Sequence, residues 1–430
     1  MNRRQFLKNT GTAAAGFWIA GRQLGYGQEK SPNAKVNVGH IGVAGMRGAD
    51  HLGAMGGQNI VALCDVDDKN LEQAAVKLPH AVKYGDFREM LEKEKTLDCV
   101  VVSTPDHVHA VAGVMAMKLG RHLYTEKPMA RTIHEVRVMT ETARARKLQT
   151  QMGTQIHAGD NYRRVVELVQ SGAIGTVTEA HVWLGGTQWT AAGLPKEGGA
   201  APEGLHWDLW LGPSEERPYS NRYHPAKWRC YWNFGGGHLA DMGCHFIDLV
   251  FWALKLGHCQ TAEAEGPEVD PHGAPPWLVA KWAFPARGEM PACTLTWYHG
   301  DKQPAQVSEG KLGDWKGAGV LFIGEKGMIV SNYGAHKLLP EADYKDFKRP
   351  EPSIAKSAGH HQEWIDAIRG GKPALCNFDY AGPLAETVLL GNVAYRTGRK
   401  LDWDAAALKA KGCPEADAFL KREYRKGWTL

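Results

Sequence analysis

The sequence predicts an α/β fold whose N-terminal part is a doubly wound parallel sheet. Short apolar runs alternate with helical patterns from residue 36 onward, and a Gly-rich turn follows the first run. The chain also has 430 residues, more than one simple core requires. We therefore expect two domains, of which the first is of the nucleotide-binding, Rossmann type.

The N-terminal alternation places candidate ligand-binding segments directly after predicted strands. The predicted strands cover residues 36–41, 60–64, 98–103 and 122–125. The predicted helices cover residues 70–78, 87–94, 109–119 and 133–145. Because ligands of a doubly wound sheet bind at the carboxyl ends of its strands, we expect the site at these ends.

A Gly-rich turn, G-V-A-G-M-R-G over residues 42–48, joins the first predicted strand to a helical pattern. Such a turn lets a pyrophosphate approach the backbone, and the helix start donates N–H groups to it. The spacing is G-x-x-G-x-x-G, with Ala44 where the second Gly is usual, and a plain Gly-rich turn is the alternative. The predicted nucleotide-binding residues of the turn are Gly42, Ala44, Gly45, Met46, Arg47 and Gly48.

Asp65 ends the second predicted strand, where a carboxylate accepts hydrogen bonds from a ribose diol. An Asp there repels a 2′-phosphate, so the predicted cofactor is NAD. The third strand runs into T-P-D-H-V-H at 104–109, and the fourth runs into E-K-P at 126–128. The further predicted cofactor-binding residues are Thr104, Pro105, His107, His109, Glu126, Lys127 and Gln155.

In order and spacing, these motifs and C-D-V-D at 64–67 resemble the glucose-fructose oxidoreductase/inositol dehydrogenase family. The likeness continues in G-G-G-H-L-A-D-M-G-C-H-F-I-D at 235–248 and covers most of the chain. It implies a Rossmann domain, then an α/β domain with a large, mostly antiparallel open sheet. It also implies hydride transfer between a nicotinamide and a ring hydroxyl of a sugar or cyclitol. The family's catalytic set corresponds here to Lys127, Asp241 and His245.

The chemistry of these side chains fits alcohol oxidation, in which a base removes the hydroxyl proton while a hydride leaves the same carbon. Residues 239–254 read as one helix, so Asp241 and His245 are neighbours on one face. We assign His245 as the base, Lys127 as a hydroxyl hydrogen-bond donor or alternative base, and Asp241 as an orienting acceptor. A helix-surface ion pair and a surface Lys are the alternatives.

The second domain contains a Trp-rich irregular stretch between residues 205 and 233. Its aromatic rings are expected to line a sugar-binding site, in which polar side chains hydrogen-bond to the hydroxyl groups. The alternative is a loop that packs under the sheet. The adjacent His360 and His361 favour no metal site, because neighbours on a helix point apart. The predicted substrate-binding residues are Lys127, His157, Tyr162, Trp207, His224, Trp228, Arg229, Asp241 and His245.

The predicted boundaries are 1–30 for a signal and linker, 34–155 for the nucleotide domain, 156–378 for the substrate domain, and 379–430 for a C-terminal helix and tail. Strands are predicted at 177–184, 277–284, 292–298, 320–324 and 327–331, and the chief helices at 162–171 and 379–396. The open sheet face implied by the resemblance suggests a homodimer or homotetramer.

Residues 2–8, N-R-R-Q-F-L-K, and the Ala/Gly-rich stretch 10–20 resemble a twin-arginine export signal, with a short N-terminal helix as the alternative. The stretch is too short for a stable membrane span. We therefore expect a periplasmic protein that takes up NAD before export and keeps it. The formal charge of +4 and the lack of a basic block argue against nucleic acid as a partner.

Three functions are compatible with the sequence. The first is an NAD-dependent dehydrogenase that oxidises a ring hydroxyl of a pyranose or pyranoside. The second is an NAD-dependent glycosidase that acts through transient C3 oxidation and elimination. The third is a non-catalytic sugar sensor on the same fold, which the presence of Lys127, Asp241 and His245 disfavours.

Overall fold

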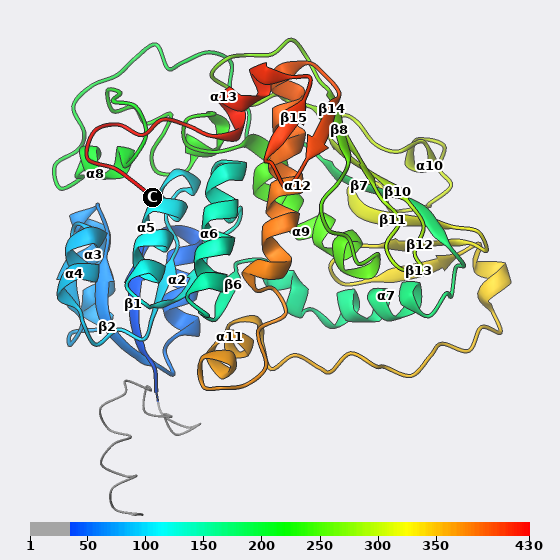
Figure 1. The fold of residues 1–430 in the computed structure, drawn as a ribbon, viewed down its shortest axis with the longest axis horizontal. Coiled ribbons are helices and arrows are strands. Elements are labelled where there is room, and N and C mark those ends of the chain that lie inside the picture. The colour runs from blue at the N-terminus through cyan, green and yellow to red at the C-terminus, as the bar shows by residue number, and fades with distance from the viewer. Residues whose placement is uncertain (1–34) are drawn as a thin grey trace, which may run out of the picture. The chain divides into compact units, whose positions relative to one another are not determined.

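The computed structural model describes residues 35–430, and the predicted export signal lies outside the described residues. The described part contains a six-stranded and a nine-stranded sheet with helices packed on both (Figure 1). None of the helices within residues 35–430 is long and apolar enough to cross a membrane.

The six-stranded sheet is parallel throughout and has the order β3-β2-β1-β4-β5-β6. Its central strand β4 is buried along its whole length, as expected where helices cover both faces. The strand order reverses between β1 and β4, which is where ligands of doubly wound sheets bind. The strands are β1 (Asn37–Ile41), β2 (Asn59–Cys64), β3 (Val82–Tyr84), β4 (Cys99–Val102), β5 (His122–Thr125) and β6 (Thr150–Met152).

Helices follow the strands of this sheet in the predicted alternation. The last of them, α6, begins at a capping box, in which Thr132 and Glu135 satisfy each other's backbone N–H groups. The helices are α2 (Gly45–Ala54), α3 (Asp68–Lys77), α4 (Phe87–Lys93), α5 (Asp106–Lys118) and α6 (Ile133–Ala145).

The nine-stranded sheet has the order β13-β12-β11-β7-β10-β9-β8-β14-β15. Its pairs are antiparallel except β7 with β10, so the mostly antiparallel sheet implied by the resemblance is confirmed. The strands are β7 (Val177–Gly185), β8 (Thr261–Glu265), β9 (Leu278–Phe284), β10 (Cys293–Gly300), β11 (Ala318–Gly324), β12 (Met328–Ser331), β13 (His336–Leu339), β14 (Leu401–Asp404) and β15 (Lys409–Lys411).

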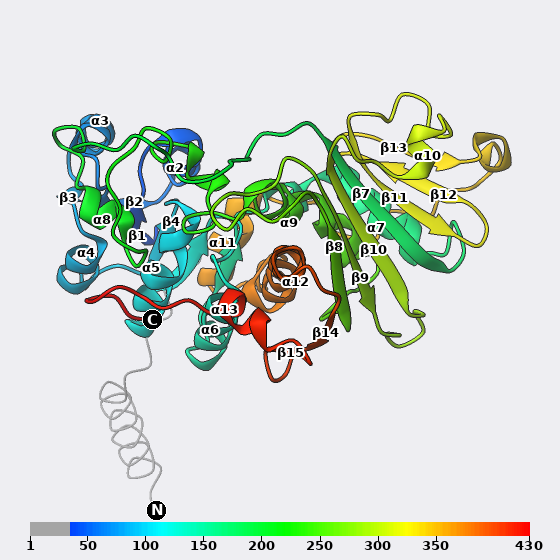
Figure 2. The ribbon, with the colours of Figure 1, turned by 90° about the horizontal axis from the view of Figure 1, so that it is seen from above.

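Two long helices, α9 (Gly237–Ala253) and α12 (Phe378–Thr397), pack on this sheet. Helix α12 also contacts α6, so it lies between the two sheets (Figure 2). The buried ion pair between Arg137 of α6 and Glu386 of α12, at 2.9 Å, joins the two layers. The remaining helices are α7 (Asp160–Gln170), α8 (Trp207–Leu211), α10 (Ala305–Ser308), α11 (His360–Ile368) and α13 (Asp417–Leu420), with short 3₁₀ turns η1 (Gln155–Ala158), η2 (Lys227–Cys230), η3 (Glu341–Tyr344) and η4 (Pro414–Ala416).

The strands that the sequence did not predict lie mostly at the edges of the sheets. β13, β14 and β15 are short and carry charged residues, so they lack the apolar pattern of a buried strand. β14 and β15 come from the predicted C-terminal tail and extend the nine-stranded sheet. The tail thus supplies part of the second domain as well as packing on it.

We predict that Gly48→Ala destabilises the protein by about 1–3 kcal/mol, because a core that is already filled must shift to admit the methyl group. A Cβ at Gly48 would lie 2.5 Å from the carbonyl oxygen of Gly42. Urea and thermal unfolding measure the effect. Gly53→Ala, in the same helix, is the matched control, since its Cβ would meet nothing within 4 Å. Equal stability of the two variants would contradict the prediction.

Candidate active site

A cavity of about 830 Å³ extends from the carboxyl ends of β1, β2, β4 and β5 to helix α9. It therefore lies where the strand order predicts a ligand, and it reaches into the second domain. The predicted site residues that line it are Gly42, Ala44, Gly45, Met46, Arg47, Asp65, Thr104, Pro105, Glu126, Lys127, Gln155, His224, Trp228, Arg229, Asp241 and His245.

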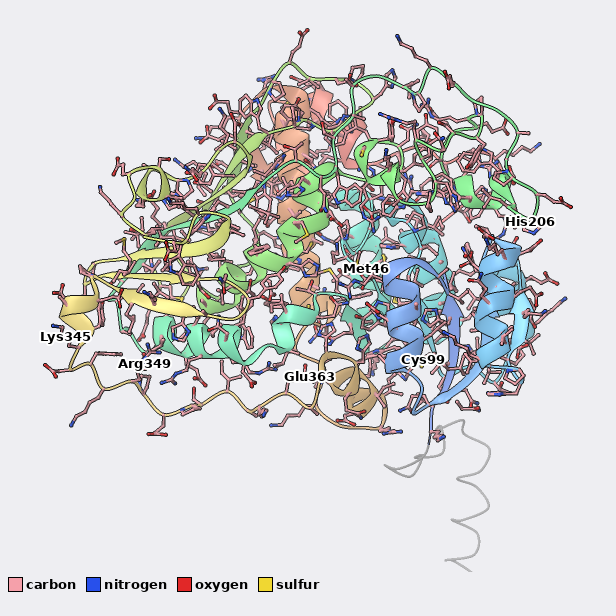
Figure 3. The ribbon with its side chains drawn as sticks, turned by 180° about the vertical axis from the view of Figure 1, so that it is seen from behind. Met46, Cys99, His206, Lys345, Arg349 and Glu363 are labelled. Carbon is pink, nitrogen blue, oxygen red and sulfur yellow. The ribbon has the colours of Figure 1, made fainter. Side chains whose placement is uncertain are left out.

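The Gly-rich turn has the geometry that a dinucleotide requires. Gly42 and Gly45 have φ of 83° and 67°, which favour glycine. A Cβ at Gly45 would meet nothing within 4 Å, so the backbone beside it faces open space in the cavity. Helix α2 begins here, and Ala44 provides no side-chain cap, so its first N–H groups remain available to a phosphate. Met46, labelled in Figure 3, marks this helix start.

Asp65 holds the turn in place from the end of β2. Its Oδ2 accepts a hydrogen bond from the Val43 N–H at 2.9 Å, and its Oδ1 accepts one from the Asp67 N–H at 3.0 Å. Burial raises the pKa of Asp65 to about 6, although these hydrogen bonds oppose the shift. Each carboxylate oxygen has a further lone pair, so Asp65 can still accept from a ribose hydroxyl. The residues present thus fit NAD.

Glu126 of the E-K-P motif belongs to a buried polar network at the end of β5. Its Oε1 accepts from His51 Nε2 at 2.8 Å and from Gln155 Nε2 at 3.0 Å. Burial opposes ionisation, but the hydrogen bond and charge of His51 and the charge of Lys127 lower the pKa of Glu126 to about 2. A Cβ at Gly153 would lie 2.3 Å from Oε1. The carboxylate is therefore ionised and closely packed.

Lys127 and Asp241 form an ion pair between the two domains. Lys127 Nζ donates to Asp241 Oδ1 at 2.6 Å and to the Asp241 carbonyl oxygen at 2.7 Å. An ammonium has three N–H donors, so one remains for a ligand in the cavity. The side chains are 8% and 12% exposed, which places this donor in a largely water-free site.

Two further side chains converge on Asp241. Trp189 Nε1 donates to Oδ2 at 2.6 Å, and Arg229 Nε donates to Oδ1 at 3.3 Å. The Arg229 guanidinium lies 4.1 Å from the Trp228 ring centroid. Burial opposes ionisation, but Lys127 and Arg229 hold the pKa of Asp241 well below its usual range. Asp241 therefore orients Lys127 and Arg229; among residues 35–430, no hydrogen bond joins it to His245.

His245 is a neutral imidazole at the inner end of the cavity. Burial, and then the charge of Lys127, lower its pKa to about 3. Within the described residues its Nδ1 is buried without a hydrogen-bond partner, which is unusual in a folded protein. The Tyr162 hydroxyl donates to the His245 carbonyl oxygen at 3.2 Å and so supports the helix at this position.

Several predicted site residues do not line the cavity. His107 Nε2 contacts the Trp210 carbonyl oxygen at 2.8 Å, and His157 Nδ1 contacts Asp248 at 2.9 Å. Trp207 stacks on Trp210 with ring centroids 4.5 Å apart. The predicted residues outside the cavity lining are Gly48, His107, His109, His157, Tyr162 and Trp207.

Two of these residues still shape the site from behind it. His109 contacts the Pro128 and Thr104 carbonyl oxygens, each at 2.9 Å, and so ties together the loops after β4 and β5. Gly48 lets α2 approach the turn closely, as described above. The structure thus gives them supporting positions.

The sequence did not predict Asp106, Tyr333 or Trp428 as site residues, yet all three line the cavity. Asp106 directly follows Thr104 and Pro105, so its position after β4 was an available signal. Tyr333 and Trp428 come from distant segments whose local sequence carries no such signal. They reach the cavity only through the tertiary fold.

His360 and His361 each contact another group of the protein. His360 Nε2 contacts the Met152 carbonyl oxygen at 2.9 Å, and His361 Nε2 contacts His51 Nδ1 at 2.7 Å. Within the part of the chain that the structure describes, no group of three His, Cys, Asp or Glu side chains is arranged to hold a metal ion.

Two family models match the chain. The first, an oxidoreductase family with an NAD-binding Rossmann fold, matches residues 36–154. The second, the C-terminal alpha/beta domain of an oxidoreductase family, matches residues 159–283.

The chain is also similar to curated proteins over part of their length. A glycosyl hydrolase family 109 protein of Solibacter usitatus is 35% identical over 196 residues, covering 41% of this chain and 44% of that protein. One of Saccharopolyspora erythraea is 26% identical over 261 residues, covering 54% of this chain and 51% of that protein. The matches thus span about half the length of these relatives.

Solved structures share the fold over most of the chain. The WlbA dehydrogenase of Bordetella pertussis, in complex with NADH and UDP-GlcNAcA, has a TM-score of 0.60 and 18% identity over 86% of this chain and 99% of that one. Levoglucosan dehydrogenase, in complex with NADH and levoglucosan, has a TM-score of 0.58 and 17% identity over 86% and 99%.

We predict that Asp106→Asn stabilises the protein more at pH 8 than at pH 5. Burial raises the pKa of Asp106 to about 7, above the unfolded value of about 3.9. The folded state therefore binds the proton more tightly, so this contribution to stability is present below about pH 4 and is lost as the pH rises through 7. Asn keeps the shape without titrating.

Thermal unfolding of both proteins across this pH range measures the difference. Glu197→Gln, which changes an exposed carboxyl, is the control and should give a difference that does not vary with pH in this way. A midpoint difference for Asp106→Asn that stays constant from pH 5 to pH 8 would contradict the prediction.

Proposed function

The chain belongs to the glucose-fructose oxidoreductase/inositol dehydrogenase (Gfo/Idh/MocA) family of NAD-binding oxidoreductases. We therefore propose that it transfers a hydride between a ring hydroxyl of a pyranose or pyranoside and bound nicotinamide. The observation that carries the proposal is the convergence of Lys127, Asp241 and His245 on one cavity with the nucleotide-binding turn. The two family models confirm, at the level of the family, the resemblance stated from the motifs.

We propose a role for each of the three side chains. Bound NAD⁺ supplies the hydride acceptor. As the C–H bond breaks with its electron pair and the alcohol becomes a ketone, the hydroxyl proton passes to the neutral imidazole of His245. The free N–H of Lys127 donates to the oxygen as negative charge develops there, and Asp241 holds Lys127 in place.

A pyranoside fits the rest of the cavity wall. Trp189 and Trp228 line it together with Arg229 and His224, so aromatic faces stand beside donors suited to hydroxyl groups. The similar structures hold levoglucosan and UDP-GlcNAcA, which both contain a sugar ring, and this supports the same substrate class.

An NAD-dependent glycosidase is the second candidate, favoured by the glycosyl hydrolase family 109 relatives and by Asp106. In such a reaction, oxidation at C3 gives a ketone that acidifies the C2–H bond. Loss of the C2 proton then expels the C1 substituent. Water adds at C1, and return of the hydride to C3 restores the alcohol. The departing oxygen needs a proton. Asp106 is buried in the cavity wall and has a pKa raised to about 7, so it fits that donor.

We further propose that the protein is exported to the periplasm by the twin-arginine route and retains its NAD. The paired Arg at positions 3 and 4 and the following Ala/Gly-rich stretch support this. A homodimer or homotetramer formed through the outer face of the nine-stranded sheet is the proposed assembly.

The test incubates the purified protein, with the cofactor it carries, with a panel of nitrophenyl pyranosides and the matching free sugars. We expect keto-sugar in the mass spectrum and NADH absorbance for a dehydrogenase, or nitrophenol release without net NADH for a glycosidase. His245→Ala should lower turnover by about 10²–10⁴-fold, the usual contribution of a general base.

His80→Ala, which changes an exposed His of the nucleotide-binding domain, is the control and should leave turnover unchanged. Wild-type turnover in His245→Ala would refute the base assignment. No hydride transfer and no aglycone release across the panel would leave the non-catalytic sugar sensor as the better description.

A further inference from the structure

The C-terminal segment, residues 421–430, ends against one side of the cavity. Trp428 lines the cavity beside Asp86 and Phe87 and is only 8% exposed. Its ring centroid lies 5.9 Å from that of Phe87 and 4.3 Å from the Arg88 guanidinium. Phe87 and Arg88, the first two residues of α4, therefore hold the indole in place.

The part of the cavity lined by Asp86, Phe87 and Trp428 lies on the side where the adenosine of a dinucleotide would bind. Asp65 stands at the end of β2, where the ribose of a dinucleotide binds in a Rossmann fold. Asp86 and Phe87 follow the neighbouring strand β3 and so lie farther from β5 and Lys127 than Asp65 does. Trp428 thus stands where an adenine ring would extend beyond the ribose.

The segment before Trp428 is held by several independent contacts. Arg422 donates to Glu135 at 2.9 Å and to the His107 carbonyl oxygen at 2.6 Å. The Tyr424 hydroxyl also donates to Glu135, at 2.6 Å. Arg425 donates to the Gly212 carbonyl oxygen at 2.5 Å. These contacts hold the segment across the outside of α5.

We propose that Trp428 completes the adenine-binding wall and that the C-terminal segment thereby slows the release of NAD. The segment forms part of this side of the cavity, so an adenine leaving here must displace an indole that packs against Phe87 and Arg88. The proposal rests on NAD binding by the Rossmann domain and not on the proposed sugar chemistry.

The experiment measures NADH release from the holoprotein, by fluorescence after dilution into excess NAD⁺. We expect Trp428→Ala and a chain ending at Gly427 to release NADH about tenfold faster, since loss of a buried aromatic contact of about 1.4 kcal/mol corresponds to that factor. Trp428→Phe should release it at an intermediate rate.

Trp277→Ala, which changes a partly buried Trp that lines neither this cavity nor the hollow described below, is the matched control and should release NADH at the wild-type rate. Circular dichroism establishes that the variants are folded. A wild-type release rate in folded Trp428→Ala would overturn the proposal. If that variant fails to fold, an unchanged rate in Trp428→Phe and in the truncated chain would overturn it instead.

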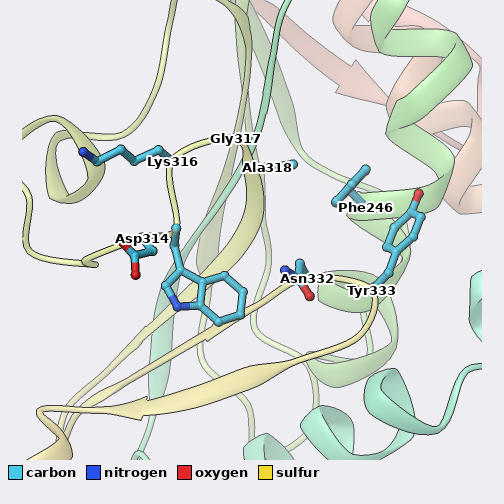
Figure 4. A pocket seen from close by; sticks show the side chains of 8 residues that line it. Phe246, Asp314, Lys316, Gly317, Ala318, Asn332 and Tyr333 are labelled. Atoms are coloured by element: carbon cyan, nitrogen blue, oxygen red, sulfur yellow. The ribbon is translucent and has the colours of Figure 1, made fainter.

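A second feature is a hollow of about 620 Å³ that meets the cavity at Tyr333 (Figure 4). The Tyr333 ring stacks on Phe246, with centroids 4.7 Å apart, and lies 6.4 Å from the ring of His245. The Tyr333 ring therefore lies between the hollow and the proposed base. Its lining residues are Phe246, Asp314, Trp315, Lys316, Gly317, Ala318, Asn332 and Tyr333.

The lining combines aromatic rings with short polar groups. Asn332 Oδ1 accepts from the Gly334 and Ala335 N–H groups at 3.0 and 2.9 Å, which fixes the amide. No hydrogen bond within residues 35–430 uses its Nδ2, so this donor is free for a ligand. The partly buried Trp315 adds a ring on which the apolar face of a sugar can stack.

We infer that this hollow binds the second ring of a glycoside whose first ring lies between Lys127 and His245. The inference rests on the proposed function and narrows its substrate class to disaccharides and larger glycosides. Tyr333 marks the passage between the two positions.

The test compares methyl β-D-glucopyranoside with cellobiose, and methyl α-D-glucopyranoside with maltose. We expect Trp315→Ala to lower kcat/KM about tenfold for the disaccharides and to leave the methyl glucosides within about twofold, since stacking contributes about 1 kcal/mol. Trp315→Phe should keep most of the activity, and Trp428→Ala should not change the ratio between the two substrate sizes.

An equal effect on both substrate sizes, or none on either, would overturn the inference. So would a change of oligomeric state in Trp315→Ala on size-exclusion chromatography, because the hollow would then be a subunit contact. If the wild type turns over none of these sugars, glucosides fail as substrates of the proposed reaction. Saturation-transfer NMR with cellobiose and maltose then decides: binding that Trp315→Ala loses supports the hollow, and no binding overturns it.

Discussion

The ion pair between Lys127 and Asp241 is the interaction on which the site depends. Lys127 follows β5 of the parallel sheet, and Asp241 lies on the first turns of α9 in the other domain. The pair therefore fixes the position of the second domain's residues relative to the nucleotide-binding strand ends. Trp189 and Arg229 are positioned through the same carboxylate, so the aromatic wall and the reactive centre share one anchor.

Burial gives three neighbouring ionisable groups three different states. Asp241 stays ionised because two cations compensate its desolvation, and His245 stays neutral because burial and Lys127 both disfavour its protonation. Asp106 is buried without such close pairing, and its pKa rises towards neutrality. One small cavity thus holds a fixed anion, a neutral imidazole and a carboxyl that can exchange a proton near pH 7.

The sequence predicted the parts of this site that short-range patterns encode. Strand ends of a parallel sheet meet at one edge, so Gly45, Asp65 and Lys127 could be placed together from their positions alone. The helical spacing also predicted that Asp241 and His245 share one face of a helix. It did not predict that Asp241 pairs with Lys127, or that His245 Nδ1 has no hydrogen-bond partner among residues 35–430. Trp428 and Tyr333 reach the cavity through long-range packing, which no local pattern records. The strands β13, β14 and β15, which lie at or next to the edges of the nine-stranded sheet, were missed for a related reason: their pairing partners, and not their own composition, make them strands.

The two kinds of glycine near the nucleotide site are irreplaceable for different reasons, and this difference constrains how the family's members can diverge. At Gly42 the positive φ disfavours any side chain, and a Cβ would also lie 2.8 Å from the Ser103 backbone. At Gly153 the obstacle is the Glu126 carboxylate. A side chain at 153 would displace that carboxylate and break its hydrogen bonds with His51 and Gln155. We therefore expect positions 51, 126, 153 and 155 to vary together among related sequences.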